Sequence, residues 1–592
     1  MKIQYLNGSR LLRGLQIGGM AIIRNQKHLN EINVFPVADA DTGFNLAMTM
    51  QAIMQRSKIG HTLKETLDSV ADSALTGARG NSGIIFAQYL HGLSRELPEI
   101  GVLTATHFAQ SAQRAVKHLY DSLINPVEGT ILTVIREWAD HLVEQSQKTS
   151  DFLHLLTSSL AAARKSLHET TTKLKVLTEL GVVDAGARGF VYFLEGVVDF
   201  INHGSLRELK LQAPDVVDQS QIEIHTDAPN KYRFCTEAIL SDVCTSMETL
   251  KRSLSSYGDS LILAGSVEKL HLHIHTNNPD ALFEELFSLG QVSAAKVDDM
   301  LRQYQIANQR KYPIGLITDT ACDLPQSILD EHQIVQIPFG LSFGKRFYLD
   351  KQTILPERFY NMLKTCKDHP VSSQPSPASV ESIMTFALAN YKQILNVHIS
   401  DKLSGVLNTV STFAAKQDPG RAGVINSRHL SVSEGLLVLR IARAIESGCS
   451  FDAILHDADT WIANTKIYTD VNTLRYMVRG GRVKPLTGLI AALLNLKPIV
   501  SLDSEGKAIA WGKSFSRSRN MSKIARIIKQ EIATKRVWEY AIVHADARER
   551  AITYSNLLSE IIGKEPAYIM PLAPVVGVHN GNGAVGIGVS YD

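Results

Sequence analysis

The chain has 592 residues, of which 44% are hydrophobic and 20% are charged, and its formal net charge is +2. A chain of this length exceeds what one hydrophobic core supports, so we expect about three or four domains. The balanced charge argues against nucleic acid as a partner, and the five scattered cysteines argue against a secreted disulfide framework. The apolar runs 15–23 and 486–496 are too short to span a membrane. We therefore expect a cytoplasmic protein without an integral membrane segment.

Residues 1–205 are predicted to be almost entirely helical. Apolar residues recur there at spacings of three and four, which is the pattern of amphipathic helices. The clearest stretches are 63–75, 107–123, 131–142 and 152–167. The polar segment 206–230, which contains Pro214 and Pro229, is predicted to be a linker.

Two runs in the loops of this helical region suggest a nucleotide–metal site. Run 33–43 holds Asp39 and Asp41 two positions apart, and closely spaced carboxylates suit Mg²⁺, which completes its shell with water and substrate phosphates. Run 77–83 is a Gly-rich turn before a helix, which offers backbone N–H groups to phosphate. Paired Asp residues are also common in ordinary turns. The sequence contains no P-loop motif.

Residues 231–311 are predicted to form a small α+β domain. The alternating segment 270–275 predicts a strand that carries three histidines on one face. These are His271, His273 and His275. Cys235 could approach them from another strand and complete a Zn²⁺ shell. The alternative is a solvated strand face, because no Cys-x-x-Cys motif is present.

Residues 312–592 have the pattern of an α/β domain. Short apolar strands are predicted at 314–317 and 394–399, and each is followed by Ser, Asp and Gly residues and then by a helical pattern. Apolar strands that alternate with helices are typical of a covered parallel sheet. The whole chain is thus predicted to be multidomain, with an all-α domain, then a small α+β domain, then an α/β domain.

The helical region contains two further runs, 128–136 and 181–189. With the two runs above, and in this order, they resemble the nucleotide-binding domain of the bacterial fatty acid kinase catalytic subunit. That domain is akin to the DhaL subunit of dihydroxyacetone kinases. The resemblance implies a helical barrel that binds ATP and Mg²⁺. The region 231–311 resembles the middle domain of the same kinases, with a cysteine and two histidines at matching places.

These resemblances imply roles for individual residues. Asp39 and Asp41 would be catalytic Mg²⁺ ligands, with Asn33 where the DhaL relatives have a third carboxylate. Other nucleotide-binding positions would be Thr42, Gly80, Asn81, Ser82, Gly83, Thr130 and Asp184. Arg188 would be a catalytic residue of the last loop, with a surface salt bridge as the alternative. The residues that match the possible Zn²⁺ site are Cys235, His273 and His275.

The sequence departs from the kinase pattern at a few positions. Ala38, Ala40 and Ala187 replace Pro or Gly, and Phe44 stands where the family has a small hydroxyl residue beside the metal run. The acidic pair is kept, so we expect a working metal site.

The last region resembles the DegV family of fatty-acid-binding proteins over its whole length. The matching segments are 318–325, 372–377, 400–405, 479–482, 494–499 and 579–583. The resemblance implies an α/β, two-lobed fold and a pocket whose polar side chains bind a fatty acid carboxylate. These side chains would be Ser372, Ser373, Ser404, Arg482 and His579. Val406 and Asn582 depart from the family pattern.

Together the resemblances imply a single-chain fatty acid kinase that makes acyl phosphate from ATP and a bound fatty acid. A fatty acid carboxylate, with a pKa of about 4 to 5, is ionised at pH 7 and needs no general base. We expect a homodimer, with an acyltransferase of phospholipid synthesis acting downstream. One alternative is a dihydroxyacetone-type kinase, although no segment resembles the domain that holds that substrate. Another is a lipid-binding or lipid-sensing protein with an inactive kinase scaffold.

Overall fold

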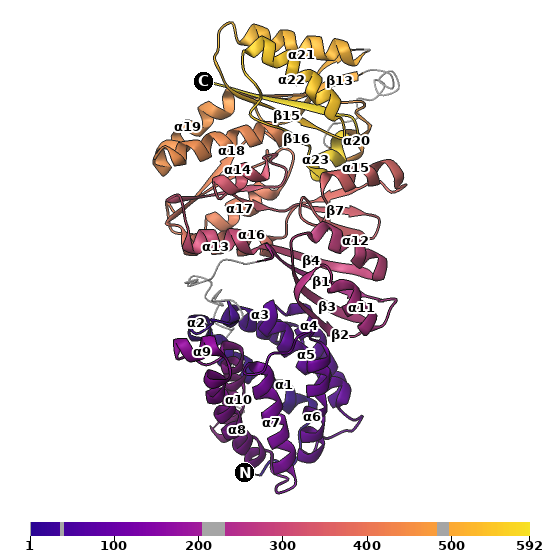
Figure 1. The fold of residues 1–592 in the computed structure, drawn as a ribbon, viewed down its shortest axis with the longest axis vertical. Coiled ribbons are helices and arrows are strands. Elements are labelled where there is room, and N and C mark those ends of the chain that lie inside the picture. The colour runs from indigo at the N-terminus through magenta and orange to yellow at the C-terminus, as the bar shows by residue number, and fades with distance from the viewer. Residues whose placement is uncertain (1, 36–40, 204–230, 482–496, 515) are drawn as a thin grey trace. The chain divides into compact units, whose positions relative to one another are not determined.

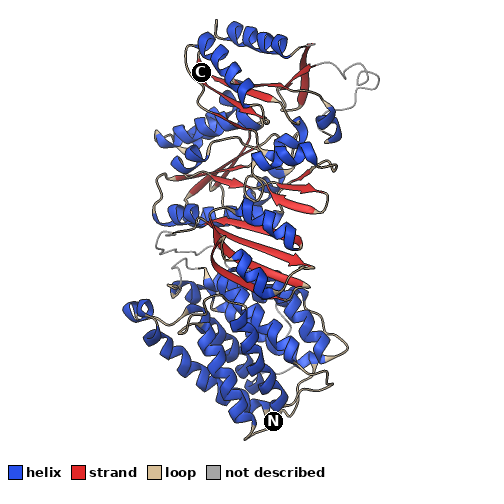
Figure 2. Cartoon of the chain, turned by 45° about the vertical axis from the view of Figure 1, so that its right-hand side comes forward, coloured by secondary structure: helices blue, strands red, loops and turns tan. Residues whose placement is uncertain are grey.

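The computed structural model describes residues 2–35, 41–203, 231–481, 497–514 and 516–592 (Figure 1). Its contacts divide the chain into two compact units, Met1–Asn308 and Gln309–Asp592. The first unit combines a helical part with a four-stranded sheet, and the second is an α/β unit (Figure 2). No helix within the described ranges is long and apolar enough to cross a membrane. The predicted linker and the site candidates Asp39 and Arg482 lie outside the described residues.

The helical part of the first unit is built from amphipathic helices around one core. They are α1 (Gly8–Arg24), α2 (Gln26–Glu31), α3 (Thr42–Arg56), α4 (Leu63–Gly77), α5 (Gly80–Glu96), α6 (Ala105–Asp121), α7 (Ile131–Ser146), α8 (Phe152–Lys173), α9 (Lys175–Leu180) and α10 (Ala185–His203). Side-chain caps fix several helix starts, because Asn7, Thr62 and Thr104 each accept a hydrogen bond from the backbone N–H three residues on. In the core, Trp138 packs edge-to-face on Phe190. The predicted all-α region is confirmed.

The middle part of the first unit is an antiparallel sheet of order β2-β3-β1-β4. Its elements are β1 (Phe234–Ser241), α11 (Met247–Leu254), β2 (Gly258–Gly265), β3 (Lys269–Thr276), α12 (Pro279–Leu289), β4 (Gln291–Asp299) and α13 (Met300–Asn308). In β3, Leu270, Leu272 and Ile274 are buried in a core with α11 and α12. The alternating histidines therefore lie on the opposite face, as predicted.

The histidine face of this sheet packs on the helical part of the same unit. The Nδ1–H group of His271 donates to the Leu75 carbonyl in α4 (2.7 Å). The backbone N–H of Gly265 donates to the Gln88 side chain in α5 (2.7 Å). The face with the predicted Zn²⁺ ligands is thereby held against α4 and α5.

The second unit contains a parallel sheet of order β11-β10-β5-β6, a mainly antiparallel sheet of order β14-β13-β12-β17-β15-β16, and a small sheet of order β8-β7-β9. The strands are β5 (Ile314–Asp319), β6 (Val335–Ile337), β7 (Gly340–Phe343), β8 (Arg346–Leu349), β9 (Val371–Ser373), β10 (Gln393–His398), β11 (Ala422–Asn426), β12 (Thr465–Asp470), β13 (Lys497–Leu502), β14 (Ala508–Ser514), β15 (Val537–His544), β16 (Ile569–Pro571) and β17 (Val585–Tyr591). The helices are α14 (Gln326–Glu331), α15 (Pro356–Thr365), α16 (Pro377–Asn390), α17 (Val406–Ala414), α18 (Ser431–Glu446), α19 (Phe451–Ala463), α20 (Arg475–Arg479), α21 (Arg517–Glu531), α22 (Arg548–Ile562) and α23 (Pro574–Asn580). The predicted α/β class with a parallel sheet is confirmed.

The order in which the chain adds strands to the parallel sheet reverses between the two central strands, β5 and β10. The chain continues from β5 to β6 on one side and from β10 to β11 on the other. In open α/β sheets, ligands bind outside the carboxyl ends of the strands at such a point. There Asp319 Oδ2 accepts a hydrogen bond from the Ile399 N–H (3.1 Å) and lies 3.0 Å from His398 Nδ1. This buried pair holds the two diverging loops together.

Candidate functional site

Four helices of the first unit begin at the four sequence runs, and their N-terminal ends lie together. These helices are α3, α5, α7 and α10. A Cβ atom added to Gly186 in α10 would lie 3.2 Å from Ser82 Oγ in α5 and 3.4 Å from Ile131 Cβ in α7. One added to Gly83 would lie 3.2 Å from the Asn45 carbonyl oxygen in α3. Because each helix N-terminus carries partial positive charge, this junction favours phosphate groups.

The glycines of run 77–83 also have a packing role. Gly80 has a φ of +54°, and a Cβ atom there would overlap the Asn45 amide of α3. Glycine therefore permits both the left-handed turn and the close approach of α3 to α5. In the first turn of α5, Asn81 Oδ1 is buried, and no described group donates a hydrogen bond to it. A metal ion or a nucleotide hydroxyl group would satisfy this oxygen.

The described part of the acidic run lies at the start of α3. Asp41 directly precedes the helix. Thr42 Oγ1 donates to Asn33 Oδ1 (2.7 Å), and Asn33 is buried. This hydrogen bond ties the upstream segment to the helix end that faces α5.

Thr130 and Asp184 cap two of the converging helices. Thr130 Oγ1 donates to the Val127 carbonyl (2.8 Å) and accepts from the Leu132 N–H (3.4 Å) at the start of α7. Asp184 is buried and accepts from the Ala187 N–H (2.7 Å) at the start of α10. Burial raises the pKa of Asp184 to about 6, although backbone hydrogen bonds act in the opposite direction. Both side chains hold the helix starts in place.

The Arg188 side chain is 23% exposed and contacts its own helix. Its guanidinium lies 3.8 Å from the centroid of the Tyr192 ring, and Nη1 lies 3.5 Å from Glu195 Oε1. Both partners are on α10 itself. These contacts correspond to the salt-bridge alternative, and the catalytic role of Arg188 stays a prediction.

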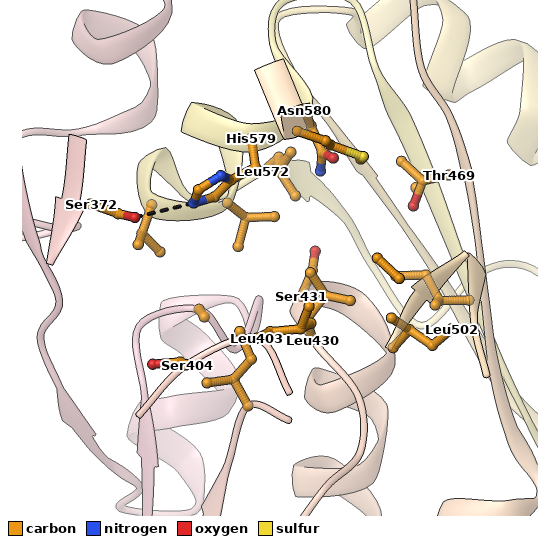
Figure 3. Close-up of a pocket in the computed structure, with 18 of the residues that line it drawn as sticks. Ser372, Leu403, Ser404, Leu430, Ser431, Thr469, Leu502, Leu572, His579 and Asn580 are labelled. Atoms are coloured by element: carbon orange, nitrogen blue, oxygen red, sulfur yellow. Dashed lines mark hydrogen bonds between the residues drawn. The ribbon is translucent and has the colours of Figure 1, made fainter. Parts of the chain in front are cut away.

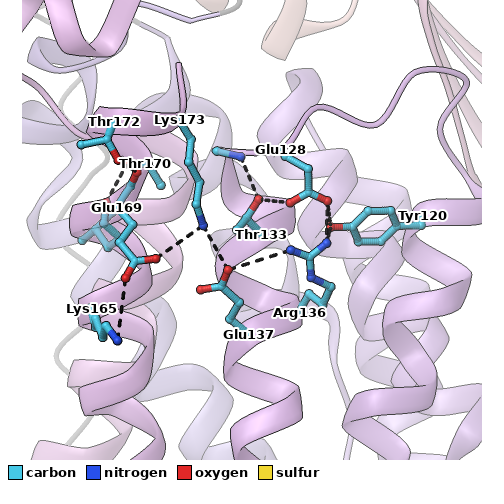
Figure 4. A network of polar contacts seen from close by, with 12 residues as sticks. Tyr120, Glu128, Thr133, Arg136, Glu137, Lys165, Glu169, Thr170, Thr172 and Lys173 are labelled. Carbon is cyan, nitrogen blue, oxygen red and sulfur yellow. Dashed lines mark hydrogen bonds and ion pairs between the residues drawn. The ribbon is translucent and has the colours of Figure 1, made fainter. Parts of the chain in front are cut away.

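Run 128–136 forms a polar network on the surface of the helical part (Figure 4). Arg136 pairs with Glu128 (2.6 Å), and Lys173 pairs with Glu137 (3.1 Å). The pairs are half-exposed, so they contribute about 1 kcal/mol or less each. The run and Glu137 therefore link α7 to α6 and α8.

Cys235, His273 and His275 come together on the histidine face of the sheet. Cys235 is paired with His275 in the register of β1 and β3, and the three ligand atoms lie within 4.8 Å of one another. The Nε2 atoms of His273 and His275 are 3.3 Å apart. Two nitrogens bound to one tetrahedral Zn²⁺ at ~2.0–2.1 Å would be about 3.3–3.4 Å apart. His273 is 2% exposed, so the alternative of a solvated strand face is wrong, and the group fits Zn²⁺.

The protonation of this group depends on its burial. Burial, and after it the charges of Glu237, Asp298 and Asp41, raise the pKa of the Cys235 thiol well above its ordinary value. Burial and the neighbouring imidazole lower the pKa of His275 to about 3. A metal ion would therefore find a neutral imidazole and would have to displace the thiol proton. Asp41 is thus near enough to influence the charge of this cluster.

Sequence reasoning missed Glu237. It lies on the same face as Cys235, two residues further along β1, and its Oε1 accepts a hydrogen bond from the Gly80 N–H (3.1 Å). Its Oε1 also lies 3.4 Å from His273 Nδ1. The period of two in β1 could have placed Glu237 beside Cys235, but no local signal joins it to Gly80 in α5.

A pocket of about 180 Å³ lies in the second unit at the carboxyl ends of β5 and β10 (Figure 3). Apolar side chains make most of its wall. Those drawn and labelled include Leu403, Leu430, Leu502 and Leu572. Among the described lining residues, His579 is the one ionisable side chain. A long apolar ligand with one polar end suits such a pocket.

Four of the predicted head-group residues line this pocket. These are Ser372, Ser373, Ser404 and His579. Ser372 Oγ and His579 Nε2 share a hydrogen bond (3.1 Å). A Cβ atom at Gly480 would overlap the His579 ring, so this glycine lets α20 approach α23 and restrict the imidazole. The four predicted residues thus line one pocket, and their contact with a carboxylate stays a prediction.

Ser431 is a pocket residue that sequence reasoning missed. It is buried, has a φ of +56°, and its Oγ donates to Asp323 Oδ2 (2.6 Å). Asp323 Oδ1 in turn pairs with Lys351 (3.1 Å). A left-handed backbone conformation is costly for serine. The hydrogen bond to Asp323, which is itself paired with Lys351, offsets this cost and keeps Ser431 in the pocket wall.

Three segments of the chain match known protein families. Residues 36–199 match the DAK2 domain. Residues 231–307 match the middle domain of FakA-like fatty acid kinases. Residues 313–592 match uncharacterised proteins of the DegV family.

Two curated relatives match about half of the chain. An uncharacterized protein of Staphylococcus saprophyticus is 29% identical over 327 residues, which is 52% of this chain and 58% of the relative. Protein YloV of Bacillus subtilis is 30% identical over 327 residues, which is 53% of this chain and 59% of the relative. The match thus spans less than two thirds of either relative.

Two solved structures of DegV family proteins are similar to about half of this chain. A DegV family protein from Thermus thermophilus, described as binding fatty acid, is 24% identical and covers 47% of this chain and 100% of its own, with a TM-score of 0.44. DegV from Bacillus subtilis, described as a fatty acid binding protein, is 23% identical and covers 48% of this chain and 100% of its own, also with a TM-score of 0.44. By its family matches, this chain joins a DAK2 segment, a middle segment of the FakA-like fatty acid kinases and a DegV segment in one polypeptide.

Proposed function

We propose that this chain is a single-chain fatty acid kinase that transfers the γ-phosphoryl group of ATP to a fatty acid carboxylate and releases acyl phosphate and ADP. The meeting of four helix N-termini beside the acidic run, in a segment that matches the DAK2 domain, carries this proposal. The DegV match and the apolar pocket support the acceptor. The proposed domains are a kinase domain (1–205), a middle domain (231–311) and an acyl-binding domain (312–592).

In the kinase domain, Asp39 and Asp41 would hold Mg²⁺, with Asn33 and Thr42 beside them. The ion supplies neutralisation of the phosphate charge. The backbone N–H groups at the start of α5 donate to the phosphates, and the capping side chains of α7 and α10 keep the helix starts aligned. Catalysis then depends on the positioning of ATP and the acceptor and on neutralisation of the phosphate charge, which are the main requirements of phosphoryl transfer.

In the acyl-binding domain, the apolar wall holds the chain of the fatty acid and excludes water. Ser372, Ser404 and His579 donate hydrogen bonds to the carboxylate, with Ser373 and Arg482 as further donors. The ionised carboxylate attacks the γ-phosphorus directly, because it has no proton to lose at pH 7. The product is an activated acyl donor of the kind that an acyltransferase of phospholipid synthesis consumes.

The kinase assignment predicts a strong effect of Asp41→Asn. This change keeps the size of the side chain but removes a metal-binding charge, so ATP-dependent acyl phosphate formation should fall by about 100-fold or more. Trapping of the product with hydroxylamine measures it. Asp140→Asn, at an exposed position of α7, is the matched control and should retain full activity. Near-normal turnover in Asp41→Asn would contradict the assignment.

The middle domain is proposed to bind one Zn²⁺ through Cys235, His273 and His275. Elemental analysis of protein purified without chelator should find about one equivalent, and chelation should lower the melting temperature, because structural metal binding stabilises the fold. Cys235→Ala should lose the metal, whereas Cys244→Ala, at an exposed cysteine, should keep it. Protein free of transition metal would end this assignment.

A lipid-binding protein with an inactive kinase scaffold is the second candidate. The pairing of Arg188 with Glu195 favours it, because the predicted catalytic guanidinium is already engaged. Bound lipid without ATP turnover would select this candidate. Phosphorylation of dihydroxyacetone in place of fatty acid would instead show that the protein is a dihydroxyacetone-type kinase.

A further inference from the structure

Glu237 is a buried carboxylate that touches both the metal group and the start of α5. It is 4% exposed and is paired with His273 in the register of β1 and β3. Its Oε1 lies 3.4 Å from His273 Nδ1 and accepts a hydrogen bond from the Gly80 N–H (3.1 Å). Its Oε2 lies 3.8 Å from Arg79 Nη1. One side chain therefore spans from the sheet to the helix junction.

The His273 ring has the orientation of a metal ligand that is held by a carboxylate. Its Nε2 lies 3.3 Å from His275 Nε2, and its Nδ1 lies 3.4 Å from Glu237 Oε1 and 3.7 Å from Cys235 Sγ. Histidine ligands commonly donate their second N–H group to such a carboxylate, which fixes the ring. Metal binding at Nε2 would therefore also set the position and hydrogen bonding of Glu237.

The same carboxylate oxygen of Glu237 that lies beside His273 also contacts the start of α5, where phosphate is expected. The Gly80 N–H belongs to the first turn of α5, whose N–H groups have no partner within the helix. While Glu237 accepts from Gly80, its carboxylate fixes the turn and adds negative charge beside it. A change in this contact alters how the turn receives a phosphate group.

The buried carboxylate is balanced from the neighbouring strand. Lys296 stands opposite Glu237 in the register of β1 and β4. His271 Nε2 lies 3.9 Å from Glu237 Oε2. Lys296 on β4 and His271 on β3 thus face this carboxylate from the two strands beside β1.

We propose that Glu237 is a positioning residue that couples metal binding at Cys235, His273 and His275 to nucleotide binding at the start of α5. The coupling rests on the proposed kinase function, because the nucleotide is its second ligand. Coupling between two sites is reciprocal, so the metal changes nucleotide affinity by the same factor as the nucleotide changes metal affinity.

Calorimetric titration with ADP and Mg²⁺ tests this coupling in the full chain, once loaded with Zn²⁺ and once stripped by chelator. We expect the two dissociation constants of the wild type to differ by about fivefold or more. In Glu237→Gln, which keeps the shape but loses the charge, the ratio should fall to about one. Glu248→Gln, an exposed position on α11, is the matched control and should keep the wild-type ratio.

A second measurement separates coupling from misfolding. Competition with a coloured chelator gives the Zn²⁺ affinity with and without ADP, and reciprocity requires the same ratio as the first titration. Glu237→Asp keeps the charge on a shorter side chain. Its ratio of ADP dissociation constants should lie between that of Glu237→Gln and that of the wild type. Equal ADP affinity in loaded and stripped wild type, or a full ratio in Glu237→Gln, would overturn the coupling while leaving the kinase proposal intact. A wild type that binds no ADP in either form would overturn both.

Discussion

At the residue scale, the pocket of the second unit joins side chains that are distant in sequence. Ser372 and His579 are 207 positions apart and share a hydrogen bond. Family resemblance identified both, because each stands in a recognisable run. Ser431 stands at the start of a helix, where serine is an ordinary capping residue, so the sequence carries no sign of its place in the pocket wall.

The pocket predicts a modest effect of Ser372→Ala on fatty acid binding. The change removes one neutral hydrogen-bond donor and leaves the His579 ring without that partner, so affinity should fall by about 0.5–1.5 kcal/mol, or about 2–12-fold. Displacement of a fluorescent fatty acid measures it. Ser411→Ala, at an exposed position of α17, should bind as the wild type does. Unchanged affinity in Ser372→Ala would show that this hydroxyl does not contact the carboxylate.

Asp184 predicts a pH dependence of the helix junction. Its pKa is raised from 3.8 to about 6 by burial, so the folded state binds more protons than the unfolded state between these values. Stability contributed by the protonated form is thus lost as pH rises through this window, by up to about 3 kcal/mol. Asp184→Asn keeps an acceptor for the Ala187 N–H and should remove this dependence.

Hydrogen exchange of the α7 and α10 amides at pH 4 to 7 (about the window above) follows the local stability. Asp199→Asn, at an exposed position of α10, controls for a change of charge on the same helix. The same pH dependence in wild type and Asp184→Asn would show that Asp184 does not titrate in this window.

At the element scale, hydrophobic period was enough to predict the helices α4, α6, α7 and α8 and the strands β3, β5 and β10, but the strands of the six-stranded sheet were not predicted. An apolar period of three to four residues indicates the buried face of a helix, and a period of two indicates that of a strand. Burial of that face stabilises each element. The Gly-rich run 77–83 was interpreted as a phosphate turn, whereas the structure adds that Gly80 and Gly83 let α3 and α5 pack closely. Close packing of two helices depends on the partner helix, and local sequence does not show which helix that is.

This close packing predicts opposite effects for two Gly→Ala changes. A Cβ atom at Gly83 would overlap Thr49 Oγ1, and such overpacking costs about 1–3 kcal/mol. At Gly14 in α1 nothing lies within 4 Å of the added atom, so alanine should stabilise the helix by about 0.5–1 kcal/mol. Denaturant unfolding should place the two variants on opposite sides of the wild type. A rescue of Gly83→Ala by Thr49→Ala would confirm the contact, and equal stability of all variants would contradict the packing.

At the scale of the whole molecule, the sequence predicted the order of all-α, α+β and α/β regions, because each region has its own hydrophobic period. It could not predict how the middle sheet sits on the helical part. Glu237 and Gly80 are 157 positions apart, and only the folded first unit brings the face that carries Cys235 and His273 to the start of α5. Likewise, Arg188 was assigned by its run, while its contacts follow from its neighbours on α10.

The central claim is that one chain both carries a fatty acid and phosphorylates it. Native mass spectrometry of the intact chain, before and after addition of ATP with Mg²⁺, tests this most directly. We predict that the purified protein carries one fatty acid and that the mass of this ligand then increases by one phosphoryl group, in the wild type but not in Asp41→Asn. A bound fatty acid whose mass stays unchanged in the presence of ATP and Mg²⁺ would contradict the claim.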